Sequence, residues 1–349
     1  MTLALLWFIL IAILWIGFFV LEGFDFGVGM LVGILGKKDK DRRVMINTIG
    51  PLWDGNEVWL ITAGGAMFAA FPEWYATLFS GLYLPLFLIL IALIFRGVAF
   101  EYRHKRESAA WQRGWDRCII FGSFVPALVF GIGFANFVRG LPIVHDVAGR
   151  RWVMEGTVGN FFGLFMPYAL LGGVLFVTLF LFHGAIFISL KTKGEIRFAA
   201  RKFADRIGLV AIALLAIFSV WTAAAYGNGV VSWIAAVVAI LAATAGYLLI
   251  KRGREGWAFT GTVLAIIAMM VLIFSCMFPN VVPALDPVND MSIQDAASTG
   301  YTLRIMTIAS AVFLPIVLGY QAWTFWVFRK RISTQNLPVV ESAEQQPTG

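Results

Sequence analysis

The sequence predicts an all-α polytopic membrane protein with nine transmembrane helices. Of its 349 residues, 60% are hydrophobic and only 13% are charged, which leaves too little polar surface for a soluble protein of this size. The apolar runs are nearly continuous and about 20 residues long, as helices that span a bilayer require. No basic leader with a small-residue cleavage site precedes the first run, so we expect that run to be retained as a helix.

Nine apolar segments define the expected spans. They cover roughly residues 3–35, 46–71, 76–97, 117–138, 160–190, 207–226, 230–250, 257–278 and 304–328. The first and fifth are longer than a bilayer about 30 Å thick needs, so we expect these helices to tilt or to extend beyond the membrane.

A faint repeat divides the chain. Glu22-Gly23 in the first span and His183-Gly184 in the fifth are each followed by a basic loop. This suggests a four-helix unit over residues 1–140 and a second one over 141–278. An outer loop and a ninth helix then follow over 279–332, and a polar, disordered cytoplasmic tail over 333–349.

The positions of the basic residues orient the chain. Of the 27 Lys and Arg, only Arg139, Arg150, Arg151 and Arg304 fall on one side of the predicted membrane. The others fall on the opposite side, with Arg96 in the flank of the loop after the third span, so that no basic residue lies deep in a span. By the positive-inside rule the N-terminus is outside and the C-terminus is in the cytoplasm. The same distribution explains the net charge of +7 without a nucleic-acid partner.

Two pairs of acidic residues interrupt the first two spans, Glu22 with Asp25 and Asp54 with Glu57. The i, i+3 spacing places each pair on one face of its helix. A charge at membrane depth costs on the order of 2.5–3.5 kcal/mol, so these acids need a function or a partner. Both pairs fall at or below mid-membrane on the cytoplasmic side, where a pathway that loads protons from the cytoplasm would place acids. The alternative is a polar packing contact between helices, with partners among Asn47, Trp53, Asn56 and Trp59.

His183 is the only histidine inside a predicted span. A haem with two histidine ligands needs a pair at membrane depth, whereas a lone histidine on an apolar helix is more often a packing residue. With no Cys/His cluster in the sequence, we expect this chain to bind no haem or metal. Trp15, Trp53 and Trp59 lie deeper than the interfacial aromatic belt, where they either line an isoprenoid or cofactor contact or pack against other helices.

The acidic segments resemble subunit II of cytochrome bd quinol oxidases. Glu22-Gly23-Phe24-Asp25-Phe26-Gly27-Val28-Gly29 is similar to one signature of that family. The run Pro51-Leu52-Trp53-Asp54-Gly55-Asn56-Glu57-Val58-Trp59-Leu60-Ile61-Thr62-Ala63-Gly64-Gly65 is similar to a second. Residues 95–103 and 115–126 resemble the segments around the third and fourth spans. The resemblance is clearest over residues 1–140.

The resemblance implies a subunit of a respiratory complex in the bacterial plasma membrane that oxidises quinol and reduces O2 to water. The haems b558, b595 and d are then held by the partner, subunit I, and neither a haem nor a catalytic residue is expected in this chain. Its implied roles are to stabilise subunit I and to contribute a cytoplasmic proton pathway. Whether a structural quinone or lipid, or small accessory membrane subunits, bind as well stays open at this point.

The resemblance also implies roles for individual residues. Glu22, Asp25, Asp54 and Glu101 match family acids of the proton route or its entrance, and Glu57 stands where glutamine is also common. Trp53 and Asn56 are expected to support this group. From the residues alone, two other hypotheses stay open: a proton-coupled secondary transporter, and a scaffold whose acids are packing contacts.

Overall fold

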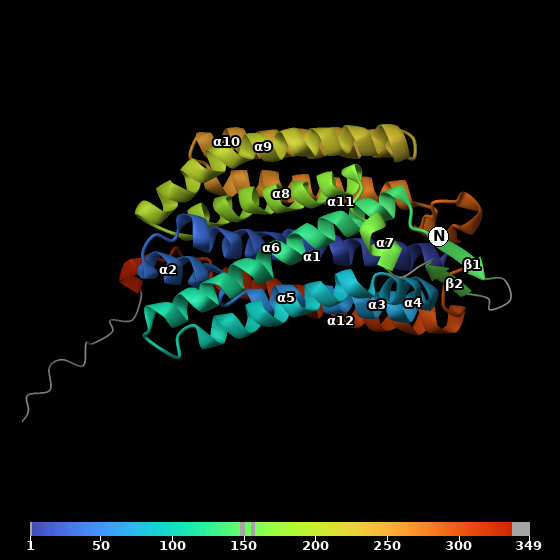
Figure 1. Ribbon diagram of the computed structural model, residues 1–349, viewed down its shortest axis with the longest axis horizontal. Coiled ribbons are helices and arrows are strands. Elements are labelled where there is room, and N and C mark those ends of the chain that lie inside the picture. Colours follow the sequence, from blue (N-terminus) through green and yellow to red (C-terminus); the bar gives the residue numbers. More distant parts are fainter. Residues whose placement is uncertain (1, 147–150, 155–157, 337–349) are drawn as a thin grey trace, which may run out of the picture.

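Long helices that run in nearly the same direction make up most of the molecule (Figure 1). The computed structural model describes residues 2–146, 151–154 and 158–336. Helix α1 (Leu3–Leu35) begins at the end of the bundle that carries two small β-sheets, which we call the hairpin end. Helix α2 (Asp39–Ile49) lies at the opposite end, together with the loops rich in Lys and Arg, and we call this the basic end.

Eight helices among the described residues are long and apolar enough to cross a membrane. They are α1, α5 (Tyr83–Tyr102), α6 (Ala109–Arg139), α8 (Pro167–Lys191), α9 (Glu195–Tyr226), α10 (Val230–Lys251), α11 (Glu255–Met277) and α12 (Gly300–Val327). Every backbone polar group inside such a helix is satisfied within the helix, which is the condition for crossing a bilayer. The prediction of a polytopic helical membrane protein is therefore confirmed.

The second expected span, residues 46–71, is not a single helix. It comprises the end of α2, a turn at Pro51, and α3 (Trp53–Ala70). Proline has no amide hydrogen to continue the helical hydrogen bonds, and its ring clashes with the carbonyl of the preceding turn, which explains the interruption. Because its first turns are polar, the mean hydropathy of α3 is too low for it to count among the eight apolar helices.

The third and fifth expected spans are also divided differently. Residues 76–97 begin inside α4 (Pro72–Gly81) and continue into α5. Residues 160–190 are split into α7 (Val158–Gly163) and α8, and Pro167 occupies the first turn of α8, where proline is well tolerated. The expectation of an overlong fifth span is therefore wrong. The overlong helix in this half is α9, with 32 residues, because its polar, basic first turns continue the helix beyond the apolar run.

Two small antiparallel sheets accompany the helices, in the segments expected as outer loops. The strands are β1 (Ile143–Asp146) with β2 (Arg151–Met154), and β3 (Asn280–Val282) with β4 (Met291–Ser292). Their Val, Ile and Trp residues favour strands. The short helix η1 (Pro287–Asn289) lies between β3 and β4, and Trp152 Nε1 donates to the carbonyl oxygen of Asn289 at 3.0 Å. The two expected outer loops thus fold together as one cap.

Helix α1 lies at the centre of the bundle, where it packs against α3, α6, α8 and α11. The approach of α1 to α8 is very close at Gly27 and Gly184. A Cβ atom on Gly27 would lie 1.9 Å from the carbonyl oxygen of Phe180, so only glycine fits there. Small residues of this kind let membrane helices pack backbone to backbone. The contact buries the second half of α1, which contains the acidic residues.

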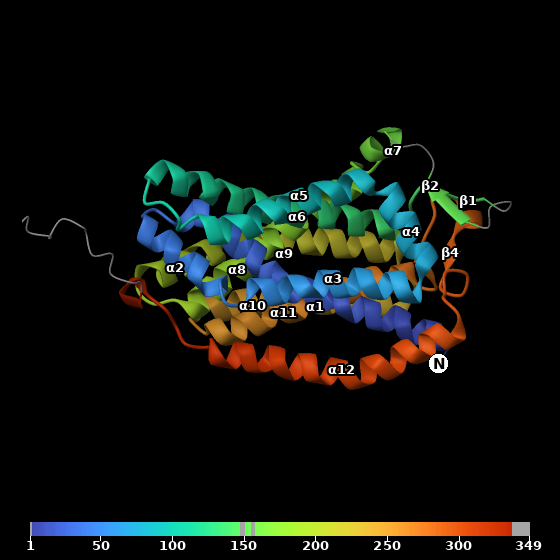
Figure 2. The ribbon, with the colours of Figure 1, turned by 90° about the horizontal axis from the view of Figure 1, so that it is seen from below.

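Helix α12 runs along the outside of the bundle beside α1 and α3 (Figure 2). Of its residues, all described, only Leu303 is buried. The chain then turns across the basic end, where the amide of Lys193 donates to the carbonyl of Ile332 at 3.0 Å. The short helix η2 (Thr334–Asn336) follows. The expected disordered tail is thus placed as far as residue 336, and 337–349 lie outside the described residues.

Candidate functional site

An arginine inside a membrane helix is the centre of the site. Arg96 lies in α5, about 9 Å before its last residue along the helix axis, and is fully buried. Its Nη1 atom pairs with Glu22 of α1 and with Glu57 Oε1 of α3 at 3.0 Å. Three helices therefore meet at one guanidinium group. The prediction that no basic residue lies deep in a span is wrong at Arg96, which is buried because carboxylates from two neighbouring helices compensate its charge.

Aromatic rings complete the surroundings of Arg96. Its Cζ atom lies 4.9 Å from the ring centroid of Phe26 and 5.4 Å from that of Phe100. Such cation–π contacts stabilise a guanidinium group most when it is desolvated. The sequence carried a signal for this residue, namely one charge within an apolar run. That signal was missed because Arg96 is the next-to-last residue of the expected span 76–97 and was therefore assigned to the flank of the following loop.

Asp25 accepts a hydrogen bond from a side-chain amide and forms no ion pair among the described residues. It is fully buried, and its Oδ2 atom accepts a hydrogen bond from Asn56 Nδ2 of α3 at 2.7 Å. The Oδ1 atom of Asn56 in turn accepts from Gln321 Nε2 of α12 at 3.0 Å. The second carboxyl oxygens, Glu22 Oε2 and Asp25 Oδ1, are buried and accept no hydrogen bond within the described part of the chain. The predicted support from Asn56 is thus seen in the structure, and Gln321 is a partner that the sequence did not reveal.

Asp54 and Glu101 lie apart from this cluster. Glu57 turns toward Arg96, whereas Asp54, one helical turn before it, is exposed. Glu101 is also exposed, and it lines a cavity of about 410 Å³ at the basic end together with Trp53 and His104. The structure therefore brings together Glu22, Asp25, Asn56 and Glu57. Asp54, Glu101 and Trp53 lie at the edge, Trp53 with its ring 5.0 Å from that of Phe100.

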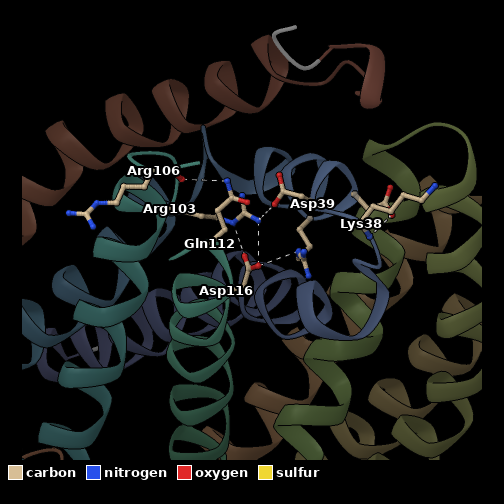
Figure 3. Close-up of polar contacts among 8 residues, drawn as sticks. Lys38, Asp39, Arg103, Arg106, Gln112 and Asp116 are labelled. Atoms are coloured by element: carbon tan, nitrogen blue, oxygen red, sulfur yellow. Dashed lines mark hydrogen bonds and ion pairs between the residues drawn. The ribbon is translucent and has the colours of Figure 1, made fainter. Parts of the chain in front are cut away.

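A second ionic cluster closes the basic end (Figure 3). The buried Arg103 donates through Nε to Asp116 Oδ1 at 2.6 Å and through Nη2 to Asp39 Oδ1 at 2.5 Å. Arg42 Nε lies 3.2 Å from Asp116 Oδ2. Burial lowers the pKa of the neighbouring His104, and the positive charges of Arg103 and Arg43 lower it further. This cluster ties α2 to α6 and to the end of α5.

His183 does not fit the role of a haem ligand. Both of its ring nitrogens are engaged, Nδ1 with Thr262 Oγ1 at 2.6 Å and Nε2 with the carbonyl of Val20 at 3.2 Å. Its ring stacks on Phe259 with centroids 4.6 Å apart. A ligand to iron needs a free ring nitrogen directed at the metal, so this histidine serves as a packing residue between α1, α8 and α11.

The arrangement around Arg96 can hold and exchange protons. Three carboxyl groups, those of Glu22, Asp25 and Glu57, surround one guanidinium group, and the charges of Glu22 and Asp25 repel each other. Fully ionised, the cluster would carry excess buried negative charge, which costs several kcal/mol per ion. Protons can therefore be shared among the three acids. No group of three or more metal-ligating side chains occurs among the residues that the structure describes.

Residues 3–328 match the family described as cytochrome bd terminal oxidase subunit II. The chain is 42% identical over 336 residues to the cytochrome bd ubiquinol oxidase subunit 2 of Bacillus subtilis, covering 94% of this chain and 96% of the relative. It is 36% identical over 370 aligned positions to the cytochrome bd-I ubiquinol oxidase subunit 2 of Escherichia coli, covering 96% and 97%.

A solved structure shares the fold. It is the bd oxidase from Geobacillus thermodenitrificans, with a TM-score of 0.75 and 17% identity, covering 94% of this chain and 99% of that chain. The sequence match extends over nearly the whole described bundle, including the helices that supply Glu22, Asp25, Asn56 and Arg96. The chain therefore belongs to the cytochrome bd terminal oxidase subunit II family.

Proposed function

We propose that this chain is the haem-free subunit of a quinol:O2 oxidoreductase in the bacterial plasma membrane. Membership of the subunit II family carries this function, since the relatives are named as subunits of ubiquinol oxidases. It also favours the oxidase subunit over a proton-coupled transporter. Because the relatives are named subunit 2, we take a haem-bearing subunit I as the partner. The haems b558, b595 and d belong there in this proposal, since His183 is engaged on both ring nitrogens.

In this proposal the basic end faces the cytoplasm, and nine helices cross the membrane. The positive-inside rule supports the orientation. Helix α3 is the ninth crossing, since its 18 residues extend about 27 Å, close to the thickness of the hydrocarbon core. Because the charge of Glu57 is paired with Arg96, α3 can cross the membrane with a lower hydropathy than the other eight helices.

Two four-helix units followed by α12 are the proposed organisation. The pairing of helices supports it, because α5 packs on α6 in the first half as α10 packs on α11 in the second. Likewise α1 packs on α3 and α6, as α8 packs on α9 and α11. In this scheme Glu22 of α1 and His183 of α8 occupy related positions.

Asp25 is the proposed proton carrier, with Asp54 and Glu101 nearer the cytoplasmic entrance. The observation behind this proposal is that Asp25 is fully buried, accepts a hydrogen bond from the Asn56 amide and forms no ion pair among the described residues, whereas Arg96 pairs with Glu22 and Glu57. A carboxyl group that is not locked in an ion pair can take up and release a proton at low cost. Proton uptake from the cytoplasm would supply the reduction of O2 to water in the partner.

A scaffold role is the second candidate for Glu22 and Glu57. Their ion pairs with Arg96 fasten α1, α3 and α5 together. Breaking a buried pair leaves an uncompensated charge. Loss of either acid is therefore expected to reduce assembly, whereas loss of a proton carrier is expected to reduce turnover alone.

Substitution of the acids in the purified two-subunit complex tests these roles. Asp25→Asn and Asp54→Asn are expected to lower quinol oxidase activity by about tenfold or more while the haem spectrum stays complete. Glu107→Gln, which changes an exposed acid of the loop after α5, is the control and is expected to keep full activity. Unchanged activity of both Asp variants would leave only the scaffold role.

An apolar cavity between α3, α4, α5 and α6 is the proposed site for a structural isoprenoid quinone or a lipid chain. It measures about 610 Å³, and Trp15, Trp74 and Phe134 contribute to its apolar lining. A Cβ atom on Gly64 or Gly133 would meet nothing within 4 Å, so these glycines widen it. Lipids and small accessory subunits are also proposed to cover the exposed apolar faces of α5 and α10.

Filling the cavity tests the proposed ligand. Gly64→Leu is expected to remove the co-purifying quinone or lipid, as measured by mass spectrometry of extracts from the complex. Gly114→Leu is the matched control, because Gly114 is equally uncrowded but does not line the cavity. Equal ligand content in both variants would argue against this site.

A further inference from the structure

Gln321 of α12 stands at the outer end of a hydrogen-bonded chain that leads to the buried acid. Gln321 Nε2 donates to Asn56 Oδ1 at 3.0 Å, and Asn56 Nδ2 donates to Asp25 Oδ2 at 2.7 Å. The chain joins the outermost helix to the central one through α3. Gln321 is half-buried, whereas most of the residues around it on α12 are exposed.

We propose that Gln321 is a positioning residue for Asp25, and that the segment after α12 holds Gln321 in place. We call this segment, residues 329–336, the C-terminal strap. The inference rests on the proposed function of Asp25 as a proton carrier. It adds two elements to that function. The amide of Gln321 orients Asn56, and the contacts of the strap hold α12, the helix that carries Gln321.

The orientation of the Asn56 amide is the first step. An amide can present either its NH2 group or its oxygen to a neighbour, and the two orientations suit different protonation states of a carboxyl group. The NH2 group of Asn56 faces Asp25, which suits an ionised carboxylate acting as acceptor. Gln321 donates to the oxygen of Asn56, so a flip of Asn56 would set two NH2 groups against each other. Gln321 therefore keeps Asn56 as a donor to Asp25.

The attachment of α12 is the second step. This helix has little buried surface of its own, and near its start Trp7 Nε1 donates to Thr307 Oγ1 at 3.1 Å. At its other end the C-terminal strap crosses the bundle (Figure 2). The amide of Ile332 donates to the carbonyl of Lys191 at 2.9 Å, and Lys193 donates back to Ile332. The strap thus forms a parallel β-bridge with the loop between α8 and α9.

An ion pair secures the same strap. Arg331 Nη2 lies 3.1 Å from Glu255 Oε2 at the start of α11, and the side chain of Glu255 is almost fully buried. Arg197 of α9 binds the other oxygen of Glu255 at 2.8 Å. Three segments therefore converge on one carboxylate. Helix α12 has little packing of its own. These contacts of the strap therefore set the position of α12 along α3, and with it the distance between Gln321 and Asn56.

The charged groups that face Asp25 are Glu22 on its own helix, Glu57 on α3 and Arg96 on α5. Gln321 is uncharged, so its loss leaves these electrostatic interactions in place. A change in the pH dependence of turnover would then report the orientation of Asn56 rather than an altered charge.

The test uses four variants of the assembled complex. Gln321→Leu removes the amide, and Arg331→Ala removes the ion pair of the strap. Thr324→Val and Arg329→Ala are the matched controls. The hydroxyl of Thr324 donates to the carbonyl of Tyr320 within α12, and the guanidinium group of Arg329 lies on Trp326 of the same helix. Quinol oxidase activity is measured as a function of pH, with the haem spectrum as the measure of assembly.

We expect Gln321→Leu to lower activity by about two- to tenfold, as for the loss of one buried hydrogen bond, and to shift the pH profile. Arg331→Ala should shift the profile in the same direction, and the double variant should be no worse than Gln321→Leu. Both controls should match the unmodified complex. If Gln321→Leu loses haem, the pH profile of Arg331→Ala is used instead: a shift supports the inference, and an unmodified profile contradicts it.

Two outcomes would overturn the inference. If Asp25→Asn is impaired while Gln321→Leu and Arg331→Ala keep the unmodified pH profile, the positioning role fails and the proton-carrier function stands. If Asp25→Asn itself retains full activity with complete haem, the proposed function fails and the inference fails with it.

Discussion

Arg96 joins three helices in the interior of this chain through its ion pairs. It is a permanent cation that is fully buried, and it is compensated by Glu22 and Glu57 from two other helices. Charged side chains inside membrane helices are rare and are usually paired in this way. Glu22 and Glu57 are thereby explained as its partners, whereas Asp25 accepts a hydrogen bond from the Asn56 amide and forms no ion pair among the described residues.

Replacing Arg96 is expected to destabilise the complex strongly. Arg96→Met leaves the buried carboxyl group of Glu22 and the half-buried one of Glu57 without their cation, at a cost of about 3–5 kcal/mol. Thermal unfolding of the detergent-solubilised complex measures this. Arg106→Met is the control, since Arg106 is exposed, its guanidinium group lies over the ring of Trp111, and it forms no ion pair among the described residues. Its effect is expected to stay within about 0.5 kcal/mol, and equal stability of the two variants would refute the structural role of Arg96.

His104 is expected to make the complex sensitive to acid. Its pKa is lowered by burial and by Arg103 and Arg43. The unfolded chain therefore takes up a proton near pH 6.5, whereas the folded chain does so only at lower pH. Stability falls as the pH drops below about 6.5 and through the folded pKa. His104→Gln should show a smaller loss of melting temperature than the unmodified complex between about pH 7 and about pH 5. An identical loss would exclude this residue as the cause.

At the scale of the elements, close helix contacts determine where the acids lie. The second half of α1 is buried because Gly27 meets Gly184 of α8 backbone to backbone. The sequence indicated the apolar runs and their approximate order. It did not show that Pro51 would divide the second expected span, or that α9 would be the overlong helix, because those limits depend on polar turns that continue or break a helix outside the apolar run.

A methyl group at Gly27 is expected to force α1 and α8 apart. Gly27→Ala would place a Cβ atom 1.9 Å from the carbonyl oxygen of Phe180, and overpacking of this kind costs about 1–3 kcal/mol. We expect a lower yield and a lower melting temperature of the complex. Gly256→Ala at the start of α11 meets no atom within 4 Å and should be neutral or slightly stabilising, since alanine favours helix. A neutral Gly27→Ala variant would contradict the close approach.

At the scale of the whole molecule, one end carries the basic loops and the other carries the two small sheets. This asymmetry predicts the orientation in the membrane. Helix α12 and the exposed apolar faces of α3 and α5 are surfaces that a membrane protein leaves to lipid or to a partner.

Thiol labelling checks the orientation. In a chain whose Cys118 and Cys276 are replaced by alanine, single cysteines are introduced at Lys38 and Val288. Val288 is 88% exposed at the hairpin end, and Lys38 lies at the basic end. A membrane-impermeant maleimide should label Val288→Cys in spheroplasts and Lys38→Cys only after permeabilisation. The reverse pattern would invert the proposed topology.

The sequence by itself determined the class of protein, the approximate spans and the family. These properties depend on composition, on runs of apolar residues and on long motifs such as Pro51–Gly65, all of which are local. It also identified Glu22, Asp25, Asn56 and Glu57 as members of one site, because their helical spacing and the resemblance agreed.

Only the tertiary structure decided which partner each acid has. Arg96 is far from Glu22 in sequence, and Gln321 is farther still from Asn56, so no local pattern could join them. The structure also separated Asp54 from Glu57, although the two are one helical turn apart. The physical reason is that a buried charge is stabilised by whatever group another helix brings within reach, and that choice is made by the packing of α1, α3, α5 and α12.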